Sequence, residues 1–553
     1  MSEKRSLNLL ALSLIFVVIT PGLVRTATYY VNRQHASAND DNPGTADLPW
    51  ATIGHAAETL VAGDEVIIGS GVYNENIFFE NSGDAVNGHI VYTGASGAAV
   101  VIDGTGLTDV NNGIVLNKSY IKLIGLEISN WNENAVWIEN AAFFEMTDCL
   151  VHDVGCGIGV ADGSHDFTFN RVEAYNYTLY GFDVSPSGGA DSYNGTFNDC
   201  VAHTGRDRDQ NVDGFALGHG TQHDFVFNRC ITYDVYDGFD ISSRRSTLNR
   251  CIAYNCWNGG YKLWQDEVTL MNCIGYDCGT AIAEVDWDGD PGVTTMMNCT
   301  FYDDDTFTVW VENAGDMLRM TNCILAGGDN IALAFEQRNV SNYQGDYNLF
   351  HNDNVNRAIV VGYEDEYSLS QIESGAWTTA SGQDAHSVVV QSAGDIFVAP
   401  DQMNLHLLQT ASAVDRGTAT GAPSQDYDGN LRPDGAGYDI GAFEFQKGVH
   451  VGRNRQTTGV PESAELFQNH PNPFNPATFI DYSLVQNGRV HIDIVDMLGR
   501  TVRNLISEEK TAGIHRVLWD GLDDTGSRVS SGVYYYTMTA EGFSETRSLL
   551  LIR

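Results

Sequence analysis

The chain has few basic residues for its size. Its 553 residues include 30 Lys and Arg against 72 Asp and Glu, a formal net charge of −42. Such an acidic surface argues against nucleic acid as a partner, because both carry negative charge. The charge is also compatible with a solvated, salt-tolerant surface. The length predicts two or more domains.

Beyond its first residues the chain also lacks a hydrophobic run long enough to cross a membrane. Residues 1–27 begin with basic Lys4 and Arg5 and continue with an apolar core from Leu9 to Ile19. This core is too short to span a bilayer, so the segment is typical of a secretory signal peptide, cleaved near residue 27. We therefore expect a protein that is secreted or displayed at the cell surface.

The middle of the chain lacks helical periodicity and repeats a short motif instead. The copies are DCLVHD, NRVEAYN, DCVAHT, RCITYD, RCIAYN, NCIGYD, NCTFYD and NCILAG, and their second residues fall at 149, 171, 200, 230, 251, 273, 299 and 323. Steps in the twenties with variable insertions indicate stacked structural repeats. Because the residues alternate as in strands, the pattern predicts a parallel β-solenoid.

Cysteine is absent outside residues 149–323, and seven of the ten cysteines occupy the repeat column. Equivalent residues of adjacent coils lie about 4.8 Å apart, but their parallel side chains fit the torsion of a disulfide poorly. We therefore expect a buried column of free thiols. Cys256 and Cys278 form a second column and are the pair in which we would expect an exception.

A second repeated pattern, Gly-apolar-x, concentrates charge on the outside of the expected solenoid. Its copies begin at Gly157, Gly181, Gly214, Gly238 and Gly260. The apolar residue should face inward, because side chains alternate along a strand, so the flanking residues face outward. Asp213 and Asp237 precede the glycine, whereas Asp240 and Lys262 follow the apolar residue. Three carboxylates and one ammonium should therefore gather in one outward patch.

Two interpretations of this patch remain open. Asp-Gly pairs commonly mark turns and need no other function. Stacked like charges are costly, however, unless a cation neutralises them, and Ca²⁺ accepts several oxygen ligands in irregular geometry.

At these residues the chain resembles the family 9 polysaccharide lyases, which are pectate lyases on a right-handed parallel β-helix. The matching stretch is DGFALG, NRCITYDVYDGFDIS and RCIAYNCWNGGYKLW. The resemblance implies that Asp213, Asp237 and Asp240 bind calcium and that Lys262 is the base of a β-elimination. It implies an acidic polysaccharide as substrate, with pectate as the leading candidate. Tyr236 stands where the family has a further aspartate, and Asp183, Asp209 and Asp234 could compensate.

Basic residues also cluster near the patch: Arg206, Arg208, Arg244 and Arg245. They could clamp a polyanion, with Arg208, Arg244 and Arg245 as the expected substrate-binding residues, or they could be solvated loop charges. Two other functions stay open. Asp237 and Asp240 could be the acid and base of a glycoside hydrolase on the same fold. Alternatively, the solenoid could be a carbohydrate-binding surface protein without activity.

The expected all-β domain order is a signal peptide (1–27), a right-handed parallel β-helix (28–447), a linker (448–463) and an immunoglobulin-like β-sandwich (464–553). Within the β-helix, residues 28–105 form an amino-terminal cap with one amphipathic helix, and YSLSQIESG predicts another short helix. The aspartates at 426, 428 and 439 could bind a metal, but turns of a carboxyl-terminal cap explain them more simply.

The carboxyl-terminal module carries the motifs PNPFNPAT, MLGR, VLWDG and SGVYYY. Several short strands with turn signals predict a β-sandwich. The motifs resemble the sorting domain of type IX secretion in Bacteroidetes-related bacteria, which implies the outer-membrane secretion machinery as a partner. A plain carbohydrate-binding sandwich is the alternative. We expect a monomer.

Overall fold

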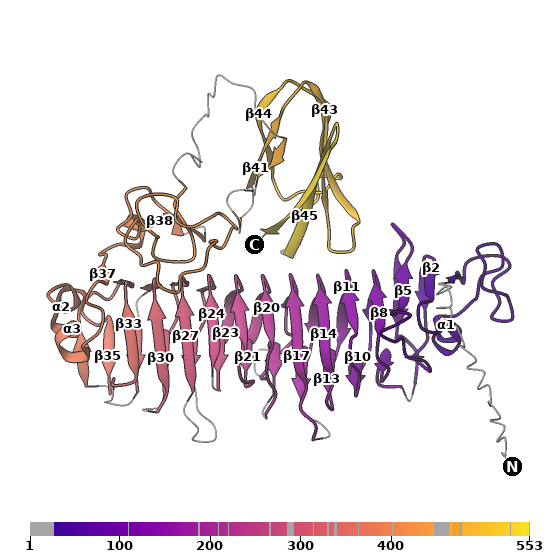
Figure 1. The fold of residues 1–553 in the computed structure, drawn as a ribbon, viewed down its shortest axis with the longest axis horizontal. Helices are drawn as coiled ribbons and strands as arrows, with labels where there is room; N and C mark the ends of the chain where they lie inside the picture. Colours follow the sequence, from indigo (N-terminus) through magenta and orange to yellow (C-terminus); the bar gives the residue numbers. More distant parts are fainter. Residues whose placement is uncertain are drawn as a thin grey trace, which may run out of the picture.

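The computed structural model describes residues 27–446 and 464–551, apart from 109, 186–188, 208–209, 219–220, 265–266, 285–291, 313–314, 329–330, 337–339, 363, 401–402, 468, 470–471, 473, 475–477 and 531. Successive coils of a parallel β-solenoid fill most of this range (Figure 1), as the repeats predicted. No helix within the described ranges has the length and apolarity that crossing a membrane requires.

Three faces of parallel strands surround the solenoid core. Among the described residues, the first face is a 13-stranded sheet. Its strands in spatial order are β1 (Thr28–Val31), β2 (Glu65–Ile68), β5 (Ile90–Gly94), β8 (Ile121–Ile124), β11 (Glu145–Thr147), β14 (His165–Asn170), β17 (Tyr193–Asn198), β20 (Val226–Asn228), β22 (Thr247–Asn249), β24 (Val268–Met271), β27 (Val293–Met297), β30 (Met317–Thr321) and β33 (Tyr343–Asp346).

The second face, here called the ladder face, comes next along each coil. Its strands are β3 (Gly71–Tyr73), β6 (Val100–Asp103), β9 (Glu127–Ser129), β12 (Leu150–Val154), β15 (Glu173–Tyr177), β18 (Val201–His203), β25 (Ile274–Tyr276), β28 (Thr300–Tyr302), β31 (Ile324–Gly327), β34 (Leu349–Asn352) and β37 (Val388–Val389). Aromatic and histidine rings stack along its outer side, namely His152, Tyr175, His203, Tyr233, Tyr254 and Tyr276.

The third face, here called the lysine face, carries the outward patch expected from the sequence. Its strands are β4 (Ile77–Phe78), β7 (Ile114–Leu116), β10 (Asn134–Glu139), β13 (Cys156–Ala161), β16 (Tyr180–Ser185), β19 (Asp213–Leu217), β26 (Thr280–Glu284), β29 (Phe307–Val311), β32 (Ile331–Phe335) and β35 (Ile359–Val361), with β36 (Asp365–Tyr367) antiparallel to β35. The long strands β21 (Ile231–Ile241) and β23 (Ile252–Leu263) belong to both the ladder face and the lysine face.

The repeated motif corresponds to one strand of the ladder face with its two corners. The residue before the buried column has a positive φ in every coil: Asp148, Arg171, Asp199, Arg229, Arg250, Asn272, Asn298 and Asn322. The last residue of the motif also has a positive φ, at the next corner of the coil; examples are Asp234 and Asn255. Asn and Asp tolerate this left-handed conformation better than most residues, which explains why they recur at these positions.

One copy of the repeated motif, NRVEAYN, is shifted by one residue relative to its predicted place in the cysteine column. We placed Arg171 in the cysteine column, but Leu150 pairs with Glu173, which puts Val172 beside Cys149. Arg171 is instead the corner residue, and its guanidinium bonds Asp148 of the preceding coil. The hydrophobic Val172 is buried, as the column requires.

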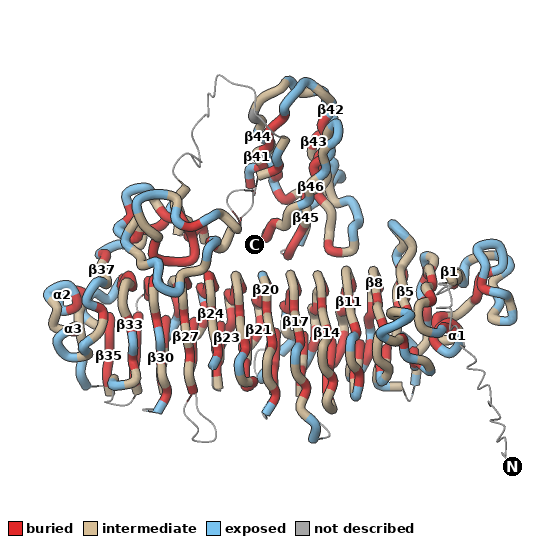
Figure 2. Tube along the Cα trace, viewed as in Figure 1, coloured by how far each residue is buried: buried red, intermediate tan, exposed pale blue. Residues whose placement is uncertain are grey.

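The solenoid interior confirms the expectation of free thiols. All ten cysteines are buried and unpaired, Cys256 and Cys278 included. Figure 2 shows buried residues along every coil. Phe182, Phe215, Phe239 and Tyr261 stack inside the coils at 4.8, 4.9 and 5.1 Å between ring centroids. These are the apolar residues of the Gly-apolar-x pattern, so their inward direction was predicted correctly.

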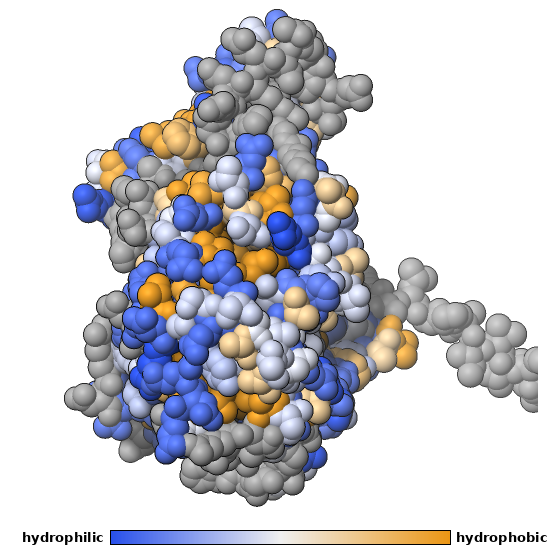
Figure 3. All heavy atoms as spheres, turned by 90° about the vertical axis from the view of Figure 1, so that its left-hand side faces the viewer, coloured by the Kyte–Doolittle hydropathy of each residue, from blue (hydrophilic) through white to orange (hydrophobic). Residues whose placement is uncertain are grey.

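Short helices lie at both ends of the solenoid (Figure 1). At the amino-terminal end α1 (Ile53–Thr59) is capped by the Thr52 hydroxyl, which accepts the N–H of His55. At the other end lie α2 (Leu369–Glu373) and α3 (Ala376–Ser381), followed by the one-turn helix η1 (Ala393–Asp395) and the pair β38 (Phe397–Ala399) and β39 (Asn404–Leu407). Viewed from this end, hydrophobic and hydrophilic side chains alternate in small patches (Figure 3).

The sequence predicts that the segment with Asp426, Asp428 and Asp439 caps the solenoid end, and this prediction is wrong. The segment folds back along the flank of the coils, where corner asparagines bind its backbone. The side chain of Asn272 donates to the carbonyl of Gln425, and that of Asn298 donates to the carbonyl of Asp439. The coil end is instead occupied by α2 and α3.

The carboxyl-terminal module is a β-sandwich of two antiparallel sheets around its own apolar core. One sheet contains β40 (Glu465–Leu466), β41 (Thr478–Leu484) and β44 (Gly513–Trp519); the other contains β43 (Thr501–Lys510), β42 (Gly488–Val495), β45 (Gly532–Ala540) and β46 (Phe543–Leu551). The predicted sandwich is thus confirmed.

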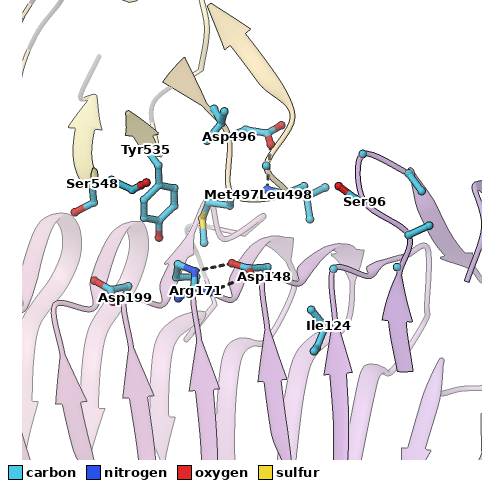
Figure 4. Close-up of a pocket in the computed structure, with 18 of the residues that line it drawn as sticks. Ser96, Ile124, Asp148, Arg171, Asp199, Asp496, Met497, Leu498, Tyr535 and Ser548 are labelled. Atoms are coloured by element: carbon cyan, nitrogen blue, oxygen red, sulfur yellow. Dashed lines mark hydrogen bonds and ion pairs between the residues drawn. The ribbon is translucent and has the colours of Figure 1, made fainter. Parts of the chain in front are cut away.

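The sandwich and the flanking segment both pack on the ladder face. Met497, Val533 and Leu550 share one buried cluster with Ile231 and Tyr233 of that face. Beside this contact the two domains line an open cavity of about 750 Å³, into which Tyr535 and Met497 reach toward the Arg171–Asp148 pair (Figure 4). In the described part of the chain, this cluster contains residues of the ladder face and none of the outward residues around Lys262.

Candidate active site

Three neighbouring coils bring the predicted site residues together on the lysine face. Phe215 of β19 pairs with Phe239 of β21, which pairs with Tyr261 of β23. The inward aromatic stack therefore fixes the register of the outward side chains. In this register Asp240 and Lys262 are direct cross-strand partners.

Lys262 is held between two carboxylates. Its Nζ lies 2.9 Å from Oδ2 of Asp237 and 3.6 Å from Oδ2 of Asp240. The ammonium also lies 4.9 Å from the ring centroid of Trp264, within range of a cation–π contact. The indole N–H of Trp264 in turn donates to Oδ1 of Asp240. The side chain of Lys262 points outward, but only 17% of it is exposed.

Asp237 is fully buried and all its neighbours hold it in one orientation. Its Oδ1 accepts hydrogen bonds from the side chain of Asn258 at 2.7 Å and from the backbone N–H of Gly259 at 2.8 Å. A Cβ atom at position 259 would lie 2.9 Å from this oxygen. The Asn-Gly pair therefore lets β23 approach the carboxylate of the preceding coil. We did not single out Asn258 and Gly259 from the sequence, although Asn-Gly is a recognisable turn signal.

Asp213 is the least satisfied carboxyl of the group. It is 1% exposed; its Oδ2 accepts from the side chain of Asn211, and its Oδ1 has no hydrogen-bond partner. Burial, and after it the neighbouring charges of Asp237 and Asp240, raise its pKa to about 9. A proton or a bound cation would relieve this carboxyl.

Asp240, Asp183 and Lys262 also have pKa values away from their ordinary range. Burial raises the pKa of Asp240 to about 6, and burial also raises the pKa of Asp183 to about 6. Burial by itself would lower the pKa of Lys262, but the carboxylates of Asp237 and Asp240 outweigh it and raise that pKa above its usual value. With these neighbours the amine is an ammonium at neutral pH.

The donor set only partly fits a calcium ion. Within the described residues, no three His, Cys, Asp or Glu side chains converge closely enough to hold a metal ion. Tyr236 supplies no carboxylate, and Asp234 lies at a coil corner where it bonds the side chain of Asn255. Asp209 lies outside the described residues. The orphan oxygen of Asp213 and the crowded charge beside Asp237 are nevertheless features that a cation would satisfy.

The predicted arginines do not join this group in the described contacts. Arg245 forms a two-point ion pair with Asp224, and it lines a hollow on the 13-stranded sheet with Asp166 and Asn194. The backbone of Arg244 forms an isolated parallel β-bridge with that of His223, beside the same sheet. Arg206 pairs with Asp153. Arg208 lies outside the described residues. Their role as polyanion clamps remains a prediction.

Comparison with known proteins agrees with this architecture. Residues 29–300 match the family model described as the Pel9A-like, right-handed beta helix region, and residues 484–543 match the FlgD Ig-like domain. No curated protein sequence gives a significant match.

Solved structures that align with this chain include three lyases. Pectate lyase Pel9A aligns with 76% of this chain and 96% of its own at 15% identity and a TM-score of 0.49. An alginate lyase from Paenibacillus sp. str. FPU-7 aligns with 53% of this chain and 95% of its own at 14% identity and a TM-score of 0.35. A rhamnogalacturonan lyase aligns with 71% and 97% at 14% identity and a TM-score of 0.36.

Proposed function

We propose that this protein is an exported polysaccharide lyase that cleaves an acidic polysaccharide, pectate first, by β-elimination. The observation that carries the proposal is the position of Lys262, an amine on the outer side of the solenoid between Asp237 and Asp240. The match of residues 29–300 to a Pel9A-like region agrees with it.

In this reaction Lys262 removes the proton at C5 of a uronic acid. The electron pair left at C5 forms the C4–C5 double bond, and the C4–O bond breaks to release the other part of the chain. The amine must be unprotonated to act as a base, yet Asp237 and Asp240 raise its pKa. Neutralising these carboxylates would lower that pKa and release Nζ for proton transfer.

To hold a calcium ion in this proposal, Asp213, Asp237 and Asp240 would have to move together, because their side chains do not converge as a metal site in the described structure. When bound, such an ion would supply positive charge that neutralises the carboxylates and stabilises the negative charge developing on the substrate. The orphan oxygen of Asp213 supports this assignment. Because Lys262 already pairs with two of the carboxylates, we expect metal and amine to compete for them.

The direct test is incubation with polygalacturonate, with and without a chelator, while following the ultraviolet absorbance of the unsaturated product. We expect absorbance to rise with the wild type and to stay flat with Lys262→Ala and with Lys262→Arg. Arginine keeps the positive charge beside Asp237 but cannot lose its proton. Lys122→Ala is the matched control, because Lys122 pairs with Glu145 on another face of the same solenoid. Full activity of Lys262→Arg would refute the role of Lys262 as base.

The same assay separates the other two functions. A hydrolase using Asp237 and Asp240 would release reducing ends without the absorbance, and the raised pKa of Asp240, about 6, would suit its general acid. A binding protein would produce neither new reducing ends nor the absorbance. The ammonium placed between the two carboxylates favours elimination over hydrolysis.

We also propose that the carboxyl-terminal sandwich directs export by type IX secretion, so that the protein is released or displayed as a monomer. The motifs in residues 464–553 support this proposal. Expression of the full chain and of a chain ending at residue 447 in a host with this pathway tests it. We expect only the full chain outside the cell, whereas equal export of both would refute the proposal.

A further inference from the structure

The outward residue of each strand forms one straight column along the lysine face. The register joins Trp137, Gly159, Asp183, Ala216, Asp240, Lys262, Ala283, Trp310, Ala334 and Val360, each beside the next. Lys262 therefore lies in line with Trp310, two coils further on. With strands about 4.8 Å apart, the two residues are separated by about 10 Å along the solenoid axis.

Trp310 has a partly exposed aromatic ring that packs against hydrophobic neighbours. Its neighbours Val309 and Val311 face the core, so its own side chain points outward. The indole stacks beside Phe307, with 6.0 Å between centroids and 16° between planes. Both rings pack against the small buried cluster of Ile331, Ala334 and Val360. The ring is thus supported by this packing, and part of its surface stays exposed.

The charge of the column differs on the two sides of Lys262. Toward the amino terminus it contains Asp240 and Asp183 before it reaches Trp137, whose indole lies against Gly159. Toward the carboxyl terminus it contains only uncharged residues, with Ala283 leaving room between Lys262 and Trp310. Within the column itself, an anionic chain therefore meets carboxylates only on the amino-terminal side of Lys262.

We propose that Trp310 is a stacking platform for a sugar ring of the acidic polysaccharide, bound two coils beyond Lys262. The inference rests on the proposed function, because it places the polysaccharide along the column that contains the catalytic lysine. The apolar face of a pyranose packs on the indole, while the small side chain of Ala283 lets the intervening sugar approach the strands. Trp310 in this role is a specificity-determining residue that contacts substrate away from the reacting atoms.

The test measures binding of oligogalacturonates of defined length by calorimetry in the Lys262→Arg background, in which the ligand is not cleaved. We expect Trp310→Ala to weaken binding about 3- to 10-fold, the range that loss of an aromatic stacking contact gives, and Trp310→Phe to restore most of it. Phe479→Ala is the matched control, since Phe479 is an exposed aromatic on β41 of the sandwich. We expect it to bind as the parent does. In turnover, Trp310→Ala should raise KM with little change in kcat.

The outcomes separate this inference from the proposed function. Unchanged binding by a folded Trp310→Ala variant, in an enzyme that produces the unsaturated product, overturns the platform alone. Binding that depends on Trp310, in a protein that forms no unsaturated product, supports the platform and overturns the lyase. Absence of binding to any oligogalacturonate overturns both. An unchanged melting temperature of Trp310→Phe shows that the packing on Ala334 is intact.

Discussion

At the scale of single residues, the pairing of Lys262 with Asp237 gives one ammonium two roles. Asp237 is fully buried, and in the described part of the chain the ammonium of Lys262 forms an ion pair with it. A buried charge without its partner is strongly destabilising, so the amine contributes to folding as well as to the proposed reaction. The sequence placed Lys262 on an outward position but implied a solvated side chain, whereas its exposure is small.

Replacement of Lys262 by Ala should therefore lower stability. We expect a loss of about 3–5 kcal/mol, because the carboxylate of Asp237 is left buried and unpaired. The double variant Lys262→Ala with Asp237→Asn should recover most of this loss, since a neutral amide can still accept the hydrogen bonds of Asn258 and Gly259. Thermal unfolding of the wild type, both single variants and the double variant measures the coupling. Additive losses would show that the pair does not stabilise the fold.

The ring of His152 is a second residue whose protonation the fold controls. Its Nδ1 lies 2.7 Å from Asp153 and its Nε2 lies 3.2 Å from Glu127, so both nitrogens donate only when the ring is charged. Burial would lower the pKa of His152, but these two carboxylates raise it above its ordinary value. Arg206 and Arg500 pair with the same carboxylates from the outside.

Stability should therefore fall as pH rises through the pKa of His152. The folded state binds this proton more tightly than the unfolded state, so the contribution is complete below the ordinary pKa of about 6.5 and is lost above the raised value. His152→Phe keeps the stacking on Tyr175, at 4.8 Å, without the proton. The melting temperatures of the wild type and of His152→Phe, measured between about pH 5 and pH 9, should differ most at the acidic end. A difference that stays constant with pH would contradict this expectation.

At the scale of elements, each coil is organised by corners and by an inward column. The sequence revealed both, because cysteines and the Asn or Asp beside them recur in every repeat. The inward side chains stack with small or aromatic groups of matching size, from Cys230 beside Cys251 to Phe215 beside Phe239. The fold class and the location of the patch could therefore be predicted without coordinates.

The thiol column offers a chemical test of this arrangement. A thiol reagent should label none of the ten cysteines in the native protein and all ten after denaturation, because every one is buried. Burial also raises the pKa of Cys149 to about 12, which leaves little of the reactive thiolate. Val86→Cys is the positive control, since Val86 is 84% exposed. Rapid labelling of the native wild type would show that the coils open or that the column is accessible.

Other features depended on contacts that short patterns do not encode. The orientation of Asp237 depends on Asn258 in the next coil, which is 21 positions away. The pairing of Arg245 with Asp224 likewise joins two coils and turns the guanidinium toward a different face from Lys262. The sequence shows that such residues lie near one another in the chain, but coil length and corner position decide which face each side chain occupies.

At the scale of the whole molecule, the docking of the sandwich leaves the proposed active face accessible. The ladder face carries apolar outward residues such as Ile231 and Tyr233, and these are buried by the sandwich and by the segment after β37. Burial of this area stabilises the contact through the hydrophobic effect. The proposal places the polysaccharide along the column of outward residues on the lysine face, and in the described part of the chain none of these residues belongs to the buried cluster between the domains.

Breaking this contact should separate the domains without abolishing the proposed reaction. Met497→Asp places a charge in the buried cluster, where it has to be hydrated, so the docked state loses stability. Leu518→Asp is the matched control, because Leu518 is 48% exposed on β44 of the same sandwich. We expect Met497→Asp to raise the radius of gyration measured by small-angle scattering and to speed hydrogen exchange around Tyr233. Turnover of polygalacturonate should stay near that of the wild type, since Lys262 lies on another face. Loss of turnover together with unchanged scattering would mean that the sandwich contributes to the active site, and the separation of roles between the two faces would be wrong.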